Sequence, residues 1–298
     1  MPLLQQIRAD FDEDLVLVNV SVDQNCDRTR AMIANGGLDW PQVCAGGGFD
    51  GRLPQAFGVD GTPTQYVLGR DGAIVGKVTA PLWRTAVAIA LAADSDRGVS
   101  TDLLRTESRR DRWQPADEAL EALRVKEGAA IADVGAGGGY FTVRIADAVG
   151  AQGRVYAVEI DPQEIDKLRA RVTAERRLNV NVIAGKPDDP RLPEAALDVV
   201  LIVNAYHEFE DHRGMLDHLQ RSLKPNGRLV IEDHVASARR DATRDAQVER
   251  HEIAPAIVER ELREAGFELV QRRALSSRDE EDQGRWLIVA RRPAERAG

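Results

Sequence analysis

The chain has 298 residues, of which 43% are hydrophobic and 30% charged, a composition typical of folded proteins and a length sufficient for two domains. Its net charge of -9 argues against a nucleic acid or an anionic membrane surface as the main partner, because both attract basic faces. No apolar run has the length of a membrane span, the N-terminus lacks signal-peptide features, and two cysteines are too few for a disulfide scaffold, so the chain as written is predicted to be cytoplasmic.

Residues 1–93 are predicted to form a first α/β domain. The expected elements are, in chain order, a valine-rich strand at 15–22, a helix at 27–35, strands at 65–68 and 73–78, and a helix at 83–93. Asp71 and Gly72 stand between the second and third of these strands and are a strong hairpin signal.

This segment resembles the later part of a thioredoxin-like (redoxin) domain, through its first strand, the run Gly61-Thr62-Pro63-Thr64 and the following hairpin. The resemblance implies a cis bond between Thr62 and Pro63. It also implies that the C-x-x-C pair and the strand before it are missing, because Met1 falls in the middle of the helix that would carry the pair. Cys26 and Cys44 do not stand at the positions of that pair, so thiol redox activity is not expected.

The missing strand would lie between the strands at 15–22 and 65–68, and buried backbone groups without partners are costly. Three explanations remain open: the gene begins upstream of Met1, the other strands close the gap, or another chain fills it. Our hypothesis is the first, and an upstream part with an export signal would change the predicted localisation.

A small, polar linker is predicted at 94–105, followed by a second domain at 106–298. Its expected strands are 130–134, 154–159, 180–184, 198–204, 228–233, 267–274 and 285–291, and its expected helices are 139–149, 162–177, 212–223 and 255–265. The alternation predicts a parallel sheet covered on both faces, and the last two strands predict an antiparallel hairpin at one edge. Ligands bind such sheets at the carboxyl ends of the strands.

The first strand of this domain runs into a glycine-dense turn, Gly135-Ala136-Gly137-Gly138-Gly139. Residues without a Cβ let the backbone turn tightly and let a ligand lie against it. A dinucleotide fingerprint would need a third glycine where this chain has Tyr140 or Thr142. The pattern therefore favours an uncharged or zwitterionic group over a pyrophosphate, and it disfavours a nicotinamide oxidoreductase.

Polar residues also follow the next three strands. Glu159 ends the second strand and can accept hydrogen bonds from the hydroxyls of a ribose. Asp188, after the third strand, is placed either to accept from an adenine amine or merely to form a polar turn. The fourth strand runs into Asn204, Tyr206, His207 and Glu208, where reacting groups are expected.

With these residues in view, the segment 106–298 resembles class I S-adenosylmethionine-dependent methyltransferases. The resemblance rests on Ala132-Asp133-Val134-Gly135-Ala136-Gly137-Gly138-Gly139, Val158-Glu159, Leu197-Asp198-Val199-Val200, and Leu223-Lys224-Pro225-Asn226-Gly227-Arg228-Leu229-Val230. It implies a seven-stranded Rossmann-like sheet with an antiparallel last strand and S-adenosyl-L-methionine as cofactor. The cofactor-binding residues that it implies are Asp133, Gly135, Ala136, Gly137, Gly139, Tyr140, Glu159, Ile160, Asp188 and Asn204.

Methyl transfer from a sulfonium needs a base only if the acceptor must lose a proton. His207 is the first candidate and Glu208 the second, although packing or capping of the next helix is an alternative role for His207. Tyr206 is expected to shape the acceptor pocket. Glu232-Asp233-His234 and His251-Glu252 are interpreted as pocket lining, and no metal is predicted, because their spacing matches no metal motif.

The leading hypothesis is therefore methyl transfer to a small molecule or a protein side chain. The alternative is a non-catalytic cofactor-binding module that regulates or supports a redox-inactive thioredoxin-like domain. The sequence shows no basic groove of the kind that would indicate a nucleic-acid acceptor. The sequence predicts neither the methylated atom nor the oligomeric state.

Overall fold

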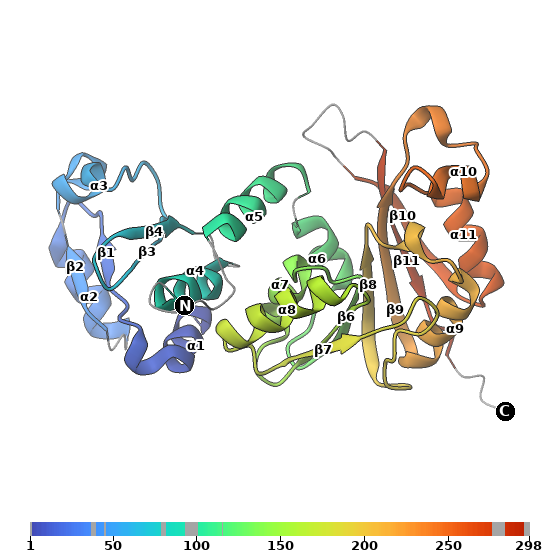
Figure 1. The fold of residues 1–298 in the computed structure, drawn as a ribbon. Helices are drawn as coiled ribbons and strands as arrows, with labels where there is room; N and C mark the ends of the chain where they lie inside the picture. The colour runs from blue at the N-terminus through green and yellow to red at the C-terminus, as the bar shows by residue number, and fades with distance from the viewer. Residues whose placement is uncertain are drawn as a thin grey trace. The chain divides into compact units, whose positions relative to one another are not determined.

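The computed structural model describes residues 2–36, 40–44, 46–78, 82–92, 101–114, 116–275 and 284–294. The chain divides into two compact units, Met1–Arg97 and Gly98–Gly298 (Figure 1). Among the described residues, no helix is long and apolar enough to cross a membrane.

Two small sheets lie in the first unit. Strand β1 (Asn19–Ser21) pairs in parallel with β2 (Gln42–Cys44), and β3 (Tyr66–Leu68) pairs antiparallel with β4 (Ile74–Lys77). Its helices are α1 (Pro2–Phe11), α2 (Cys26–Gly36), α3 (Arg52–Ala56) and α4 (Trp83–Ala92), with 3-10 turns at Asp12–Asp14 and Gly48–Asp50. The hairpin and the cis Thr62–Pro63 bond are present as predicted.

The first strand is shorter than predicted. In the described ranges, residues 19–21 are the part of the run 15–22 that has a ladder partner, and the side chains of Val16 and Val18 are 75% and 52% exposed. Within the part of the chain that the structure describes, β1 does not pair with β3, so the other strands do not close the gap.

A disulfide joins Cys26 to Cys44, which the sequence did not predict. The parallel register places Ser21 opposite Cys44, so the end of β2 lies near the chain that leaves β1. Helix α2 begins there at Cys26, and the two Cα atoms are 5.7 Å apart, a spacing typical of disulfides.

The described part of the second unit contains a seven-stranded sheet in the order β10-β11-β9-β8-β5-β6-β7. Its strands are β5 (Ala130–Val134), β6 (Arg154–Glu159), β7 (Val180–Ala184), β8 (Leu197–Val203), β9 (Leu223–His234), β10 (Glu268–Ala274) and β11 (Arg285–Arg291). Strand β11 is antiparallel to both of its neighbours, and the other pairs are parallel. The mostly parallel sheet with an antiparallel last strand is therefore confirmed.

Helices cover both faces of this sheet (Figure 1). The helices of this unit are α5 (Thr101–Trp113), α6 (Asp117–Leu123), α7 (Tyr140–Val149), α8 (Pro162–Ala174), α9 (His212–Ser222), α10 (Arg244–Val248) and α11 (Pro255–Glu264). One core cluster packs α6, α7 and α8 on the sheet through residues such as Leu123, Ile145 and Leu168. The other packs α9 and α11 through residues such as Leu219 and Leu262.

Several element boundaries differ from the prediction, among them the start of α5 and the ends of α8 and β8. Helix α5 begins at Thr101, inside the segment 94–105 that is predicted as linker. Helix α8 ends at Ala174 rather than 177, because Arg176 adopts a left-handed conformation with φ 51°. Strand β8 ends at Val203, because Asn204 turns out of the strand with φ 50°.

Candidate active site

The glycine turn lies between β5 and α7, at the carboxyl end of β5, the strand between β8 and β6. Gly135, Gly137 and Gly139 have φ values of 78°, 51° and 86°, which L side chains rarely adopt. A Cβ on Gly135 would lie 2.4 Å from Cβ of Ala205, whereas a Cβ on Gly137 would meet no atom within 4 Å. The turn is thus tightly packed at Gly135 and open at Gly137.

Glu159 joins this turn to the end of the neighbouring strand β6. Its Oε2 accepts from the backbone N–H of Gly137 at 2.7 Å, and its Oε1 accepts from those of Ile160 and Asp161 at 2.7 and 3.0 Å. The side chain of Ile160 is 52% exposed, and Asp188 is exposed in the loop that follows the next strand, β7. These predicted residues lie at the carboxyl edge of three neighbouring strands.

Asp133 supports the turn from behind. The side chain is 2% exposed, and Oδ2 accepts from the hydroxyl of Thr142 on α7 at 2.6 Å. Burial raises the pKa of Asp133 to about 6, against the effects of the Thr142 hydrogen bond and the charge of Arg110. The carboxylate therefore fastens α7 to β5.

Asp133→Asn is expected to remove part of the pH dependence of stability. Between the ordinary pKa of 3.8 and the folded value of about 6, the folded chain holds a proton that the unfolded chain has released. The free energy of unfolding of the parent therefore falls across this interval, by up to about 3 kcal/mol. Urea denaturation at a series of pH values should show the variant gaining stability relative to the parent between about pH 4 and pH 6. If the difference in the free energy of unfolding between variant and parent stays constant with pH, burial does not raise the pKa of Asp133.

The segment after β8 contains both buried and exposed side chains. Tyr206 is fully buried, its hydroxyl donates to Glu261 Oε2 at 2.9 Å, and its ring packs 5.4 Å from that of Phe209. Burial raises the pKa of Tyr206 well above its ordinary value. The structure thus places Tyr206 in the core rather than at the acceptor pocket where the sequence expects it.

His207 and Asp233 form a buried pair at the ends of β8 and β9. The imidazole Nδ1 lies 2.9 and 3.0 Å from the two carboxylate oxygens, and the side chains are 4% and 0% exposed. Because a carboxylate only accepts, Nδ1 carries a proton, and in the neutral form of the imidazole Nε2 therefore has the lone pair. Nε2 lies 3.8 Å from Oε1 of Glu208, whose side chain is 61% exposed. Burial raises the pKa of Asp233, but hydrogen bonds from His207 and His234 outweigh it and hold this pKa below its ordinary value.

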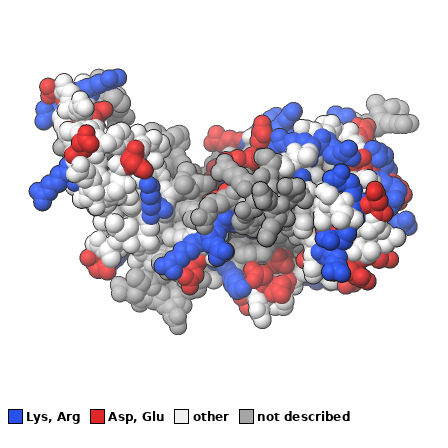
Figure 2. Space-filling view, turned by 90° about the horizontal axis from the view of Figure 1, so that it is seen from above, with Lys and Arg blue, Asp and Glu red and all other residues white. Residues whose placement is uncertain are grey.

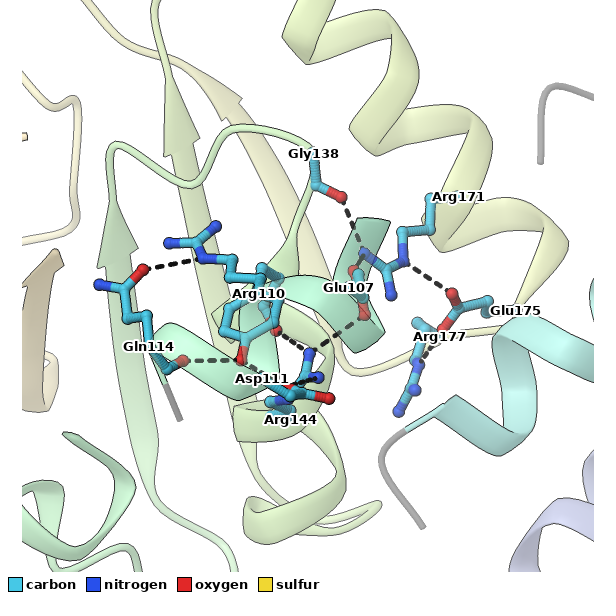
Figure 3. Close-up of polar contacts among 10 residues, drawn as sticks. Glu107, Arg110, Asp111, Gln114, Gly138, Arg144, Arg171, Glu175 and Arg177 are labelled. Carbon is cyan, nitrogen blue, oxygen red and sulfur yellow. Dashed lines mark hydrogen bonds and ion pairs between the residues drawn. The ribbon is translucent and has the colours of Figure 1, made fainter. Parts of the chain in front are cut away.

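Helix α5 packs against the glycine turn through a buried ionic network (Figure 3). Glu107 pairs with Arg144 of α7 at 3.2 Å and with Arg171 of α8 at 2.5 Å, and Arg171 also donates to the carbonyl of Gly138 at 3.0 Å. The side chains of Glu107, Arg144 and Arg171 are all at most 4% exposed.

A second set of contacts extends from α5 toward the sheet (Figure 3). Arg110 lies 4.2 Å from the ring centroid of Tyr140 and donates to Gln114 Oε1 at 2.9 Å, and Gln114 in turn donates to Glu232 at 2.8 Å. The hydroxyl of Tyr140 lies 2.5 Å from Asp111 Oδ1. Tyr140, a predicted cofactor contact, is 4% exposed and lies against α5.

Comparison with known proteins finds relatives of this chain by sequence and by fold. Residues 131–227 match the family model described as "Methyltransferase domain". The chain is 30% identical to the protein-L-isoaspartate O-methyltransferase of Ignicoccus hospitalis over 112 residues, which are 38% of this chain and 50% of that protein. It is 25% identical to a demethylmenaquinone methyltransferase of Geobacillus sp. over 119 residues, 40% of this chain and 50% of that protein. The chain thus spans about half the length of the curated relatives that it matches.

Solved structures show the same fold. A SAM dependent methyltransferase from Aquifex aeolicus superposes with a TM-score of 0.53 at 22% identity, covering 64% of this chain and 97% of that one. The [4+2]-cyclase SpnF superposes with a TM-score of 0.52 at 18% identity, covering 60% of this chain and 80% of that one. Since a cyclase shares the fold, the fold alone does not determine the reaction. The second unit therefore has the fold of the S-adenosylmethionine-dependent methyltransferases, with a matching methyltransferase domain over residues 131–227.

Proposed function

We propose that the second unit is an S-adenosylmethionine-dependent methyltransferase that acts on a small molecule or a protein side chain. The observation that carries this proposal is the glycine turn at the end of β5, open at Gly137 and hydrogen-bonded to Glu159. An open turn of this kind lets a ligand approach the backbone, and the neighbouring carboxylate offers acceptors to its hydroxyls.

The residues at this edge fit the chemistry of the cofactor. Glu159 already accepts three backbone N–H bonds, and a carboxylate has about four acceptor sites, so it can accept a further bond from a ribose hydroxyl. Ile160 offers exposed apolar surface beside it for an adenine ring, with Asp188 at the next strand end. The backbone of Gly135, Ala136, Gly137 and Gly139 and the turn at Asn204 would border the methionine portion, whereas Asp133 and Tyr140 support the turn from within. When bound, the cofactor supplies an electrophilic methyl group.

The acceptor is proposed to enter beside His207 and Glu208. Where the acceptor must lose a proton, Nε2 of His207 is the atom available to take it in a site without a metal ion, and Asp233 holds the imidazole in the required tautomer. Glu208 remains the second candidate because its side chain is exposed next to Nε2. Tyr206 is not proposed as a catalytic residue.

A protein or small-molecule acceptor also suits the surface charge. Figure 2 shows basic and acidic side chains interspersed over the visible face, without a continuous field of either sign among the side chains coloured there. A phosphate backbone would favour a basic track instead.

Two measurements test the function. Calorimetry with S-adenosylhomocysteine and with NAD should show binding of the first only, and transfer of a radiolabelled methyl group into fractionated cell extract should identify the class of acceptor. Binding of NAD alone would contradict the proposal. Binding of S-adenosylhomocysteine without transfer into any fraction would favour a non-catalytic regulatory module.

Asp233→Asn is expected to lower kcat on the identified acceptor by about a hundredfold or more, because Asn would hold His207 in the wrong tautomer. The Kd for S-adenosylhomocysteine should not change, since Asp233 is on β9, and β8 lies between β9 and the strand β5 that carries the glycine turn. His218→Ala, a half-buried histidine on α9, is the control and should change neither value. A loss confined to KM, or a parallel loss of cofactor binding, would indicate a structural role instead.

For the first unit we propose a thioredoxin-like origin without thiol redox activity. The cis Thr62–Pro63 bond and the antiparallel β3-β4 hairpin support it. Disulfides persist mainly in oxidising compartments, so the Cys26–Cys44 bond favours the exported alternative over a cytoplasmic location.

A further inference from the structure

Three potential metal ligands converge beside the proposed acceptor site. His207, Glu208 and His251 each offer one ligand atom, and these atoms all lie within 4.8 Å of one another. The first two belong to the 3-10 turn Tyr206–Glu208 after β8, and His251 follows helix α10. Because His251 is distant in sequence, the spacing of the residues gives no metal motif, and the cluster exists only in the folded chain.

The hydrogen bonding of His207 prepares its Nε2 for a ligand. Asp233 accepts from Nδ1, so the Nε2 lone pair is on the side of Glu208, at 3.8 Å from Oε1. A carboxylate behind a histidine is the usual arrangement around protein-bound metals, where it fixes the tautomer and orients the ring. Both side chains of this pair are buried, so the orientation is fixed by packing as well.

His251 is held toward the same point by an unusual backbone. Its φ of 56° lies in the left-handed region, which is uncommon for residues other than glycine and is often found at functional sites. The hydrogen bonds from His251 N to Val248 O and from Ile253 N to His234 O hold this segment in place. Its ring centroid lies 6.0 Å from that of His207.

We propose that His207, Glu208 and His251 bind a divalent transition-metal ion of the Zn²⁺ type. Two imidazoles and one carboxylate suit Zn²⁺ and its neighbours better than Mg²⁺ or Ca²⁺, which prefer oxygen ligands. Glu208 and His251 are exposed, so the three protein ligands leave open positions that face solvent. The site therefore has the form of a catalytic rather than a closed structural metal centre.

The proposed role of the cation rests on the proposed function, whereas its binding does not. An acceptor O–H or S–H that binds the cation at an open position loses its proton to water more readily. The acceptor then forms a bond to the methyl carbon, the sulfur–methyl bond breaks, and the sulfonium becomes a neutral thioether. With the cation bound, Nε2 of His207 is a ligand, so this route replaces direct proton transfer to His207.

Zinc binding to the full-length protein tests the site. After treatment with EDTA and removal of the chelator, calorimetry with Zn²⁺ should show one ion per chain, and Co²⁺ should give the visible absorption of a protein-bound ion. His251→Ala and Glu208→Gln should each weaken Zn²⁺ binding by about tenfold or more and alter the Co²⁺ spectrum. His218→Ala, which removes a half-buried histidine of α9 that is not in the cluster, should leave both unchanged.

The outcomes separate the two proposals. Absence of Zn²⁺ binding, or equal binding by the His251→Ala and His218→Ala variants, overturns the metal site and leaves methyl transfer untouched. Stoichiometric binding that depends on His251 supports the site even if no methyl transfer is found, in which case the proposed function fails separately. Methyl transfer that persists fully in EDTA and in His251→Ala overturns the catalytic role of the cation.

Discussion

Glu107→Gln is expected to lower the free energy of unfolding by about 3 kcal/mol. The substitution keeps the shape of the side chain but removes the charge that faces both Arg144 and Arg171, and breaking a buried ion pair by neutralising one partner is strongly destabilising. The expected loss is at the lower end of the range for such changes, because Arg144 also pairs with Asp111 and Arg171 with Glu175. Denaturant unfolding followed by circular dichroism measures it.

The same helix supplies a matched control. Asp102 pairs with Arg105 at 3.5 Å, but both side chains are about four-fifths exposed, at 82% and 80%. Asp102→Asn should therefore cost less than about 1 kcal/mol. Glu107→Gln should also weaken S-adenosylhomocysteine binding, because Arg171 links Glu107 to the carbonyl of Gly138 in the glycine turn (Figure 3). Equal stability of the two variants would show that the network does not hold α5 in place.

The sheet of the second unit was predictable from the sequence, whereas helix α5 was not. Strands such as β8 are buried on both faces, so they appear as continuous apolar runs that end where the strand ends. Helix α5 turns Glu107 inward together with Leu104, and Gln114 is buried directly after the helix ends. A search for apolar periodicity does not readily find such a helix, because part of its buried face is a charged group whose partners lie on other elements.

The cofactor edge was easier to predict than the acceptor edge. The glycine turn and Glu159 follow adjacent parallel strands, so topology alone brings them together, and the bond between Gly137 N and Glu159 Oε2 confirms their proximity. At the acceptor edge, consecutive residues point in opposite directions: Tyr206 turns to Glu261, and His207 turns to Asp233. Which of them faces the outside depends on the turn after β8, and residue types alone do not determine it.

In the first unit, the strand predicted at 15–22 is formed only at Asn19–Ser21. A run of valines predicts a strand only if a neighbouring strand is present to pair with it. Residues 15–18 have no ladder partner among the residues that the structure describes, and the side chains of Val16 and Val18 are exposed.

Gly135→Ala is expected to abolish cofactor binding and to lower the free energy of unfolding by about 3 kcal/mol. Two costs add at this position. The φ of 78° is unfavourable for alanine, and the new Cβ would lie 2.4 Å from Cβ of Ala205, in a place where β5 and the turn after β8 are already in contact. Relief of that overlap would move Asn204 and the glycine turn apart.

Gly137→Ala is the comparison that distinguishes packing from ligand binding. Its φ of 51° is also left-handed, but its Cβ would meet no protein atom within 4 Å, so the stability cost should be only about 1–2 kcal/mol. If the open side of the turn is the cofactor site, that methyl group occupies the space of the ligand. Calorimetry should then show S-adenosylhomocysteine binding weakened by about tenfold or more, equivalent to about 1.4 kcal/mol, in a variant that unfolds nearly as the parent does. Unchanged affinity would place the cofactor elsewhere, because the added methyl group would then stand in space that no ligand occupies.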